Sequence, residues 1–517
     1  MRIVHAASEV VGFAKTGGLA DVAGSLPRAL ARRGHDCAVV LPLYRSVRHG
    51  KQPIAPTEHV LSIPVGNRYV PGRLWRSQLP DSNVPVWLIE QSEYFERDDP
   101  AQGRSFYQFS MASGQKLDYP DNCERFVFFS RAVLEALRLL DWWPDVLHSH
   151  DWQTALTPVY LQEVYRHHPN IILRQRYEQI RSVFTIHNIA YQGLFRAADL
   201  MLTGLDWRLF NHRQLEFYGQ LNFLKSGIVF ADRITTVSPR YAEEIQTPYF
   251  GNGLQGVLSE RRDRLSGIVN GVDYDAWNPA TDSLLAANYD DETVAVGKAA
   301  CKAALQKRYG LPEEPRTPIL GMVARLVEQK GLDLTVKAAD ALLNLGAASG
   351  NQAPWHVQLI VLGEGDPVYH RMLQELRERY PDRIGLTLGF DETLAHQIEA
   401  GADIFLMPSL FEPSGLNQLY SLKYGTVPVV RACGGLYDTI ADCTPEALAR
   451  GEATGFRFVA YTSAALLVAV QRALELYRQR PDQWLQLMRN GMRKDWSWNR
   501  SAGEYEQVYQ AVVRAEA

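Results

Sequence analysis

The sequence predicts an α/β protein with two doubly wound, Rossmann-like domains. Short apolar runs typical of buried strands alternate with segments of helical periodicity along the chain, which is the pattern of parallel sheets covered by helices. The pattern starts near the N-terminus and restarts near residue 319. A chain of 517 residues is also too long for one ordinary hydrophobic core. We therefore expect two parallel sheets in separate domains that face each other across a cleft.

The first half opens with a strand-helix-strand unit. Residues 2–7 form an apolar run, and the segment after them carries an apolar stripe of helical spacing that ends at Gly34. The polar and basic residues 164–181 are expected to form a loop on the surface. The other strands expected in this half are residues 38–41, 145–148, 182–186 and 234–237.

The second half repeats the pattern. A helix is expected over residues 332–345, ended by Gly346. A glycine-studded stretch marks the boundary, so we expect domains at 1–260 and 261–495, and a C-terminal helix over 496–517 that packs back on the first domain. The strands expected in this half are residues 319–324, 357–362, 404–407 and 427–430.

Composition excludes several classes of protein. The formal net charge of −4 provides no basic field for a nucleic acid or an anionic membrane. No apolar run reaches the 18 residues of a membrane span, and an N-terminal strand argues against a signal peptide. We expect a cytoplasmic enzyme with free thiols, because the odd number of scattered cysteines forms no C-x-x-C pair: Cys37, Cys123, Cys301, Cys433 and Cys443.

The first candidate site lies where the first strand meets its helix. Lys15 precedes the pair Gly17 and Gly18, which can bring a phosphate close to bare backbone amides at the positive end of the helix dipole. This pattern indicates a phosphate site. The alternative is a tight turn with Lys15 solvated on the surface.

Polar clusters follow four of the predicted strands. Open α/β sheets bind ligands at the carboxyl ends of their strands, so these clusters are candidates for one site. Loops are polar in any protein, and this is the alternative explanation. The clusters are residues 149–154, 187–193, 325–331 and 408–418.

Two of these clusters carry charges suited to a sugar phosphate. Arg325 offers a planar fork and Lys330 a point charge for one phosphate group, although two cations around a glycine can also be a solvated loop. Glu412 can accept hydrogen bonds from sugar hydroxyls, or it can cap the following helix. With Lys15, the cations suit a departing nucleoside diphosphate, whose negative charge grows in the transition state.

His148 and His150 resemble a pair of metal ligands, since residues two apart on a strand share a face. No third ligand stands at a recognisable spacing, so no metal is expected, and His150 is assigned to a substrate hydroxyl. Residues 251–256 match G-x-G-x-x-G, but they follow no buried strand and are rejected as a nucleotide motif.

Taken together, these motifs resemble those of the retaining glycosyltransferases that build glycogen and starch in bacteria and plants. The K-T-G-G-L-A-D-V segment at residues 15–22 is the most specific match, and the resemblance runs to about residue 498. The other matching segments are residues 121–126, 150–152, 270–273, 325–331 and 412–418.

The resemblance implies the two-domain architecture called GT-B and a reaction without a cofactor. In that reaction glucose passes from ADP-glucose to the non-reducing end of an α-1,4-glucan, and the anomeric configuration is retained. Tyr94 and Asp121 fall on the acceptor side. Catalytic roles are implied for Lys15, His150, Arg325, Lys330 and Glu412. Donor binding is implied for Lys15, Gly17, Gly18, Asp21, Asn270, Arg325, Lys330, Phe390, Gly415, Leu416 and Gln418, with Phe390 beside the adenine or, alternatively, in the core.

Other functions remain open at this stage. A related transferase could use UDP-glucose or a sucrose-type acceptor, and a non-catalytic glucan-binding protein could share the fold. The residue types do not fix the nucleotide base or a general base.

Overall fold

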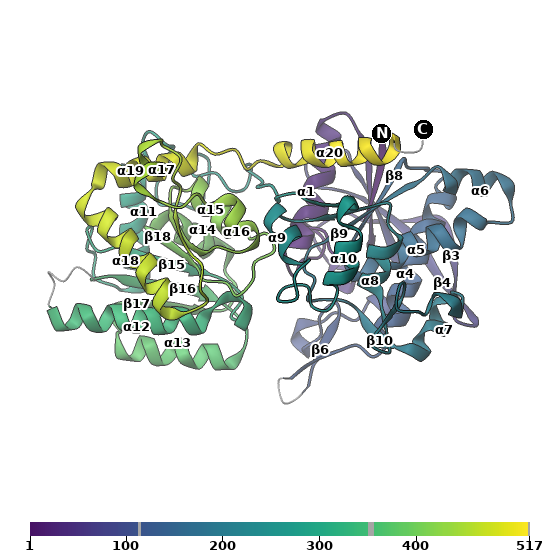
Figure 1. The fold of residues 1–517 in the computed structure, drawn as a ribbon, viewed down its shortest axis with the longest axis horizontal. Coiled ribbons are helices and arrows are strands. Elements are labelled where there is room, and N and C mark those ends of the chain that lie inside the picture. The colour runs from purple at the N-terminus through teal and green to yellow at the C-terminus, as the bar shows by residue number, and fades with distance from the viewer. Residues whose placement is uncertain (112–114, 350–355, 515–517) are drawn as a thin grey trace. The chain divides into compact units, whose positions relative to one another are not determined.

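The computed structural model describes residues 1–111, 115–349 and 356–514, with side chains left out at 345–349 (Figure 1). The chain divides into unit 1, Met1–Gly271 with Trp498–Ala517, and unit 2, Val272–Ser497. The first unit therefore ends later than the expected residue 260.

Unit 1 is built on a nine-stranded sheet of order β14-β13-β9-β8-β1-β2-β5-β4-β3. The strands β1, β2, β8 and β9 are almost wholly buried, as expected of parallel strands covered on both faces. The strands are β1 (Arg2–Ala6), β2 (Asp36–Pro42), β3 (Ala55–Val65), β4 (Arg68–Gln78), β5 (Pro85–Glu90), β8 (Val146–His150), β9 (Arg181–Ile186), β13 (Arg233–Thr236) and β14 (Leu265–Gly267).

The prediction of a wholly parallel sheet is wrong at one edge. β4 runs antiparallel to both β3 and β5. β3 and β4 are half-exposed strands, so their apolar residues form no continuous run. Their two-residue turn, Gly66 and Asn67, was the available signal for a hairpin.

Helices cover both faces of this sheet (Figure 1). They are α1 (Gly18–Arg32), α2 (Arg45–Arg48), α3 (Ser92–Phe95), α4 (Asn122–Leu139), α5 (Leu156–Glu163), α6 (Ile171–Glu178), α7 (Leu200–Thr203), α8 (Phe223–Phe230), α9 (Pro239–Glu244), α10 (Gln255–Glu260) and α20 (Trp498–Arg514). Two small antiparallel sheets are formed by β6 (Gln108–Ser110) and β7 (Lys116–Asp118), and by β10 (Leu194–Arg196), β11 (Glu216–Phe217) and β12 (Gln220–Asn222).

Two helices bear on earlier expectations. α20 returns from the end of the chain to lie against α1, and its Tyr505 and Tyr509 are buried in the core of unit 1. α6 lies within residues 164–181, so the expected loop is wrong. Asn170 caps this helix by accepting from the amides of Ile172 and Leu173.

Unit 2 contains a six-stranded sheet of order β17-β16-β15-β18-β19-β20, in which every neighbouring pair is parallel. The strands are β15 (Ile319–Val323), β16 (Gln358–Gly363), β17 (Ile384–Leu388), β18 (Ile404–Met407), β19 (Val427–Arg431) and β20 (Phe456–Phe458). The helices are α11 (Val294–Tyr309), α12 (Leu332–Ser349), α13 (Pro367–Arg379), α14 (Glu392–Gly401), α15 (Asn417–Lys423), α16 (Gly434–Thr439), α17 (Pro445–Ala449), α18 (Ser463–Gln479) and α19 (Pro481–Met492).

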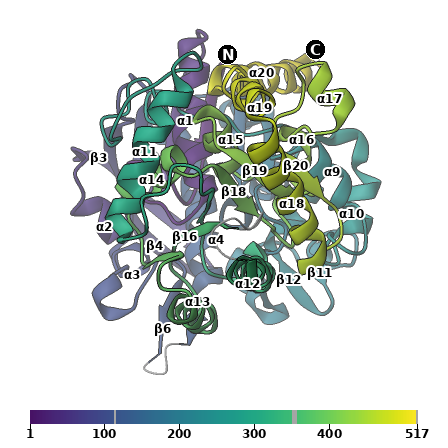
Figure 2. The ribbon, with the colours of Figure 1, turned by 90° about the vertical axis from the view of Figure 1, so that its left-hand side faces the viewer.

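The helix α12 lies beside α13 on one side of this sheet (Figure 2). It continues through Gly346 to Ser349, so the predicted termination at that glycine is wrong. A glycine inside a helix costs only about 1 kcal/mol, which the apolar face of a long helix offsets.

Each sheet has a point where the strand order reverses. In unit 1, β1 pairs with β2 on one side and β8 on the other; in unit 2, β15 pairs with β16 and β18. Ligands of open α/β sheets bind at such points, at the carboxyl ends of the strands. The four loops that follow β1, β8, β15 and β18 carry most of the predicted site residues.

Across the described ranges, no helix is long and apolar enough to cross a bilayer.

Candidate functional site

The loop after β1 forms the expected helix start in unit 1. Gly17 is the N-cap of α1, and no side chain caps the amides that follow it. A Cβ atom added at Gly17 or Gly18 would meet nothing within 4 Å, so the space before these amides is open. The Lys15 ammonium lies 2.7 Å from Asp21 Oδ1. An anion that binds here would meet a cation already held in place by a carboxylate.

Sequence reasoning missed Glu9, which anchors this loop. The buried Glu9 carboxylate accepts hydrogen bonds from the Thr16 amide and hydroxyl and from the Tyr107 hydroxyl, the last at 2.9 Å. Burial raises the pKa of Glu9. Its place just after the first strand was the only signal in the sequence. Glu9 fixes the turn that presents Lys15 and the two glycines.

The loop after β8 places His150 inside a row of imidazoles. His150 Nε2 lies 3.2 Å from His5 Nδ1, and His150 Nδ1 lies 3.0 Å from His187 Nε2. His150 is fully buried, so in this structure both of its ring nitrogens are taken by histidines. The assignment of His150 to a substrate hydroxyl stays a prediction. His150 can reach a substrate only if one of these bonds opens.

His5 is the third histidine that the sequence did not reveal. Nitrogens of His5, His148 and His150 lie within 4.8 Å of one another, a grouping that could hold a metal ion. The two ring nitrogens of His148 are engaged by the hydroxyls of Tyr509 and Thr185, at 2.7 and 2.5 Å. A metal would have to break these bonds. We interpret the group as a hydrogen-bonded network, and the absence of a metal stays a prediction.

Asp151, the next residue, has a strained backbone. Its φ of 55° is unusual for a residue with a side chain. Its buried carboxylate accepts from the His187 amide at 2.7 Å, and burial raises its pKa to about 7. This hydrogen bond ties the loop after β8 to the loop after β9. Asn270, also buried, has a side-chain oxygen without a hydrogen-bond partner in the described structure.

The histidine row makes the folded state sensitive to acid. Burial lowers the pKa of His5 and of His187 to about 3, and it also lowers the pKa values of His148 and His150. Below about pH 6.5 these histidines therefore bind protons in the unfolded chain but stay neutral in the folded chain. Each such group lowers the free energy of unfolding by about 1.4 kcal/mol per pH unit. The raised pKa of Asp151 opposes this trend between the ordinary value of 3.8 and about 7.

We expect urea denaturation at pH 7.5 and pH 5.5 to show a marked loss of stability at the lower pH. His187→Asn should reduce that pH dependence, because one buried imidazole is removed. His167→Gln, at an exposed histidine, should leave it unchanged. The same stability at both pH values would contradict the assignment of neutral, buried imidazoles.

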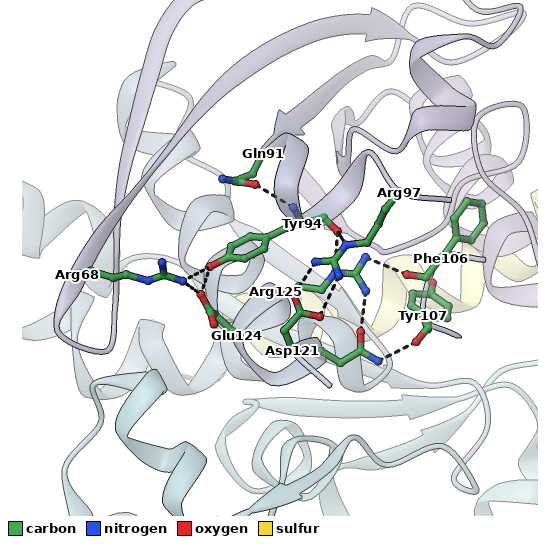
Figure 3. A network of polar contacts seen from close by, with 10 residues as sticks. Arg68, Gln91, Tyr94, Arg97, Phe106, Tyr107, Asp121, Glu124 and Arg125 are labelled. Atoms are coloured by element: carbon green, nitrogen blue, oxygen red, sulfur yellow. Dashed lines mark hydrogen bonds and ion pairs between the residues drawn. The ribbon is translucent and has the colours of Figure 1, made fainter. Parts of the chain in front are cut away.

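Figure 3 shows the network around the two residues expected on the acceptor side. Tyr94 donates to Glu124, which also pairs with Arg68, and Asp121 is held by Arg97 at 2.6 and 3.1 Å. Beneath them, the buried Arg125 binds the Tyr94 carbonyl, the Asn122 side chain and the Phe106 carbonyl. Arg125 belongs to a matching segment of the sequence, but its structural role was not predicted. It joins α4 to α3 and to the loop before β6.

The loops after β15 and β18 meet in unit 2. Lys330 Nζ lies 2.6 Å from Glu412 Oε2, and Ser409 Oγ donates to the same oxygen at 2.9 Å. Glu412 is buried, so removal of either partner would leave a charge without its counter-ion in a poorly solvated position. The sequence placed both residues at strand ends but did not predict that they pair. Neither of these two contacts uses Glu412 Oε1.

Arg325 differs from Lys330. Its side chain is exposed and has no hydrogen-bond or ion-pair partner among the described residues. That both cations converge on one phosphate stays a prediction. Phe390 is 84% exposed, so the alternative that placed it in the core is wrong. An exposed ring after β17 is free to stack on a base.

Gly415, Leu416 and Gln418 form the turn into α15. Gly415 has a φ of 68°, and Leu416 is the N-cap of the helix. The buried Gln418 donates to the Ser414 carbonyl at 2.9 Å, and no partner is found for its side-chain oxygen in the described chain. These residues hold the backbone that follows Glu412. The rejected motif at residues 251–256 follows α9 and not a strand.

Two Rossmann-like units with charged loops at their switch points define a glycosyltransferase of the GT-B class. Residues 2–260 match the starch synthase catalytic domain, and residues 305–486 match glycosyl transferases group 1. The chain belongs to the family of glycogen and starch synthases.

Relatives match over nearly the whole length. Glycogen synthase 1 of Methylococcus capsulatus is 47% identical, covering 99% of this chain and 97% of that protein. Glycogen synthase of Syntrophotalea carbinolica is 45% identical and covers 99% of both chains. The catalytic domain of starch synthase IV from Arabidopsis thaliana, solved with ADP and acarbose, has a TM-score of 0.86 at 32% identity and 99% coverage of both. Sucrose-phosphate synthase from Thermosynechococcus elongatus, at 16% identity, TM-score 0.55 and 99% coverage of both, shares the fold.

Proposed function

We propose that this enzyme transfers glucose from ADP-glucose to the non-reducing end of an α-1,4-glucan and retains the anomeric configuration. The observation that carries the proposal is the Lys330–Glu412 pair at the switch point of unit 2, in a chain of the glycogen and starch synthase family. A carboxylate for sugar hydroxyls stands there beside a cation for the phosphate.

The donor is bound by backbone amides and cations. The amides after Gly17 and the ammonium of Lys15 bind donor phosphate, while Arg325 and Lys330 bind the distal phosphate. Asp21 positions Lys15, and Gly415, Leu416 and Gln418 shape the turn beside the sugar. Asn270 binds the donor through its unpartnered oxygen.

Catalysis rests on charge stabilisation and positioning. As the bond to the phosphate breaks, negative charge grows on the nucleoside diphosphate, and Lys15, Arg325 and Lys330 stabilise it. Glu412 orients the glucose hydroxyls and stabilises positive charge at the anomeric carbon. The leaving phosphate takes the proton of the acceptor hydroxyl, so the chain needs no general base of its own. His150 binds a substrate hydroxyl once its hydrogen bond to a neighbouring imidazole opens.

The adenine nucleotide is favoured by the ADP in the related starch synthase, and Phe390 supplies an exposed ring for the base. The acceptor binds near Tyr94 and Asp121. The expected setting is the cytoplasm, with no nucleic acid, metal or cofactor involved.

To test the proposal, the purified protein is incubated with glycogen and either ADP-glucose or UDP-glucose, and the released nucleoside diphosphate is measured. We expect ADP release in step with glucose gained by glycogen. Digestion of the labelled product by an enzyme specific for α-1,4 linkages tests retention. Release from UDP-glucose alone would overturn the donor assignment, and glycogen binding without release from either donor would indicate a non-catalytic protein.

A further inference from the structure

Glu412 lies on a segment that belongs to no helix or strand. Residues 408–416 connect β18 to α15, and Ser409, Glu412 and Ser414 within this segment are buried. Backbone groups of such a segment need partners from elsewhere in the fold, because no helix or sheet ladder supplies them. The residues that supply those partners therefore hold Glu412 in place.

Arg431, the last residue of β19, holds the first part of the segment. Its Nη1 donates to the carbonyls of Ser409, at 3.4 Å, and of Leu410, and its Nε donates to the Val459 carbonyl at 3.1 Å. The guanidinium carbon lies 5.4 Å from the centre of the Tyr461 ring, so the planar group is also held from its face. Arg431 thus joins the segment after β18 to the loop after β20 through charge-assisted hydrogen bonds.

Gln329 holds the same segment from the loop after β15. Its side chain donates to the Phe411 carbonyl at 3.1 Å, and its own carbonyl accepts from the Leu410 amide at 2.8 Å. The next residue in the chain is Lys330, the ion-pair partner of Glu412. These hydrogen bonds therefore fix the spacing between the two loops that carry the ion pair.

The start of α16 lies directly against the backbone of Glu412. The Gly435 amide donates to the Glu412 carbonyl at 3.1 Å, and a Cβ atom added at Gly434 would lie 2.0 Å from the same oxygen. Gly434 also has a φ of 43°, so both the close approach and the backbone conformation require glycine. The carbonyls of residues 409–412 thus all accept hydrogen bonds from other parts of unit 2.

We propose that Arg431 and Gln329 are positioning residues that hold Glu412 in the orientation that glucose transfer needs. This role rests on the proposed function for the part that Glu412 plays. Arg431 is a cation at a strand end, like Arg325, but its Nε and Nη1 are already bonded to carbonyls, so its charge serves the backbone and not the donor phosphate. A displacement of about 1 Å can lower a rate about 100-fold, so these bonds act on kcat without a contact to the substrate.

Arg431→Ala separates positioning from phosphate binding. We expect kcat for transfer to fall about 30- to 100-fold, because the carbonyls of Ser409 and Leu410 lose their donor. The dissociation constant for ADP, measured by calorimetry without an acceptor, should change by less than about twofold. Arg325→Ala should weaken ADP binding in the same assay. A loss of ADP affinity in Arg431→Ala equal to that in Arg325→Ala would overturn the inference.

Two further measurements exclude a general loss of structure as the cause. Millimolar guanidinium can occupy the space left in Arg431→Ala and bond to the same carbonyls, so it should raise kcat of that variant about 3- to 10-fold. An equal concentration of ammonium, which is not planar, should not. Gln329→Leu removes only the bond to the Phe411 carbonyl and should lower kcat about 3- to 10-fold with ADP affinity unchanged. Wild-type kcat in both variants would overturn the inference.

Arg457→Ala is the matched control. Arg457 lies on the neighbouring strand β20, where its guanidinium carbon is 4.8 Å from the centre of the Tyr437 ring and its Nη1 donates to the Tyr437 carbonyl at 3.3 Å. This variant also removes an arginine stacked on a tyrosine and bonded to a carbonyl, but that carbonyl belongs to α16. We expect its kcat to stay within about twofold of the wild type. A loss equal to that of Arg431→Ala would contradict the proposal.

Hydrogen–deuterium exchange tests the same contacts without any chemistry. In Arg431→Ala, amides of residues 408–416 should exchange about 10-fold faster than in the wild type, while those of α18 keep their rate. Unchanged exchange in the segment, or an equal increase throughout unit 2, would overturn the inference. If the wild type transfers no glucose, the proposed function fails, and the exchange experiment still decides whether Arg431 holds the segment that carries Glu412.

Discussion

Replacement of Glu412 by glutamine should lower kcat by about 100-fold and change KM for ADP-glucose little. Glutamine keeps the shape and an acceptor for Ser409 but removes the charge that faces the anomeric carbon in the proposed reaction. Single-turnover transfer to glycogen measures the effect. If Glu412→Gln turns over at a rate close to that of the wild type, the catalytic assignment of Glu412 is wrong.

The ion pair between Lys330 and Glu412 predicts a loss of stability that the sequence did not suggest. From the sequence alone, the loss of Glu412 should barely affect unfolding. Because Lys330 would keep its charge beside an empty space, Glu412→Ala should lose about 3 kcal/mol of stability. The double variant Glu412→Gln with Lys330→Met should recover part of that loss but no activity. Chemical denaturation of the variants beside the transfer assay separates the two roles.

The second large effect is expected at Arg325. Arg325→Ala should lower kcat/KM for ADP-glucose about 10- to 100-fold, the value of one charge-assisted bond to phosphate. Because its side chain is exposed and makes no ion pair in the described structure, the unfolding temperature should not change. Lys330→Ala should show a similar kinetic loss together with lower stability, since Glu412 loses its partner.

Arg316→Ala is the matched control. Arg316 is an exposed arginine near the amino end of β15, whereas Arg325 follows the carboxyl end of the same strand. Its removal takes away the same charge from the same unit at the wrong end of the sheet. Equal losses of kcat/KM in the two arginine variants would mean that the net charge of the unit attracts the donor, and that Arg325 makes no specific contact with its phosphate.

The central strands could be predicted because burial on both faces leaves continuous apolar runs. All nine expected strands are present, from β1 to β19, with ends shifted by a residue or two. The edge hairpin β3–β4 was missed because half-exposed strands carry no such run, and α6 was missed because its apolar residues Ile171 and Ile172 face water.

The site could be predicted only in part, for a different reason. A position at a strand end can be read from local pattern, so Lys15, Arg325 and Glu412 were found. A partner cannot be read in this way when the chain between two residues is long. Lys330 and Glu412 are 82 residues apart in the chain, and His5 and His150 are 145 apart. Only the order of the strands in each sheet brings these pairs together.

Because α20 completes the core of unit 1, the unit that begins first is finished last. During synthesis, residues 1–271 leave the ribosome without the ring of Tyr509 that closes over His148, and all of unit 2 follows before that ring appears. Unit 2 is continuous in sequence and is complete earlier. A nascent chain therefore carries an unfinished N-terminal core through most of translation, and a stop codon near residue 497 would leave it permanently open.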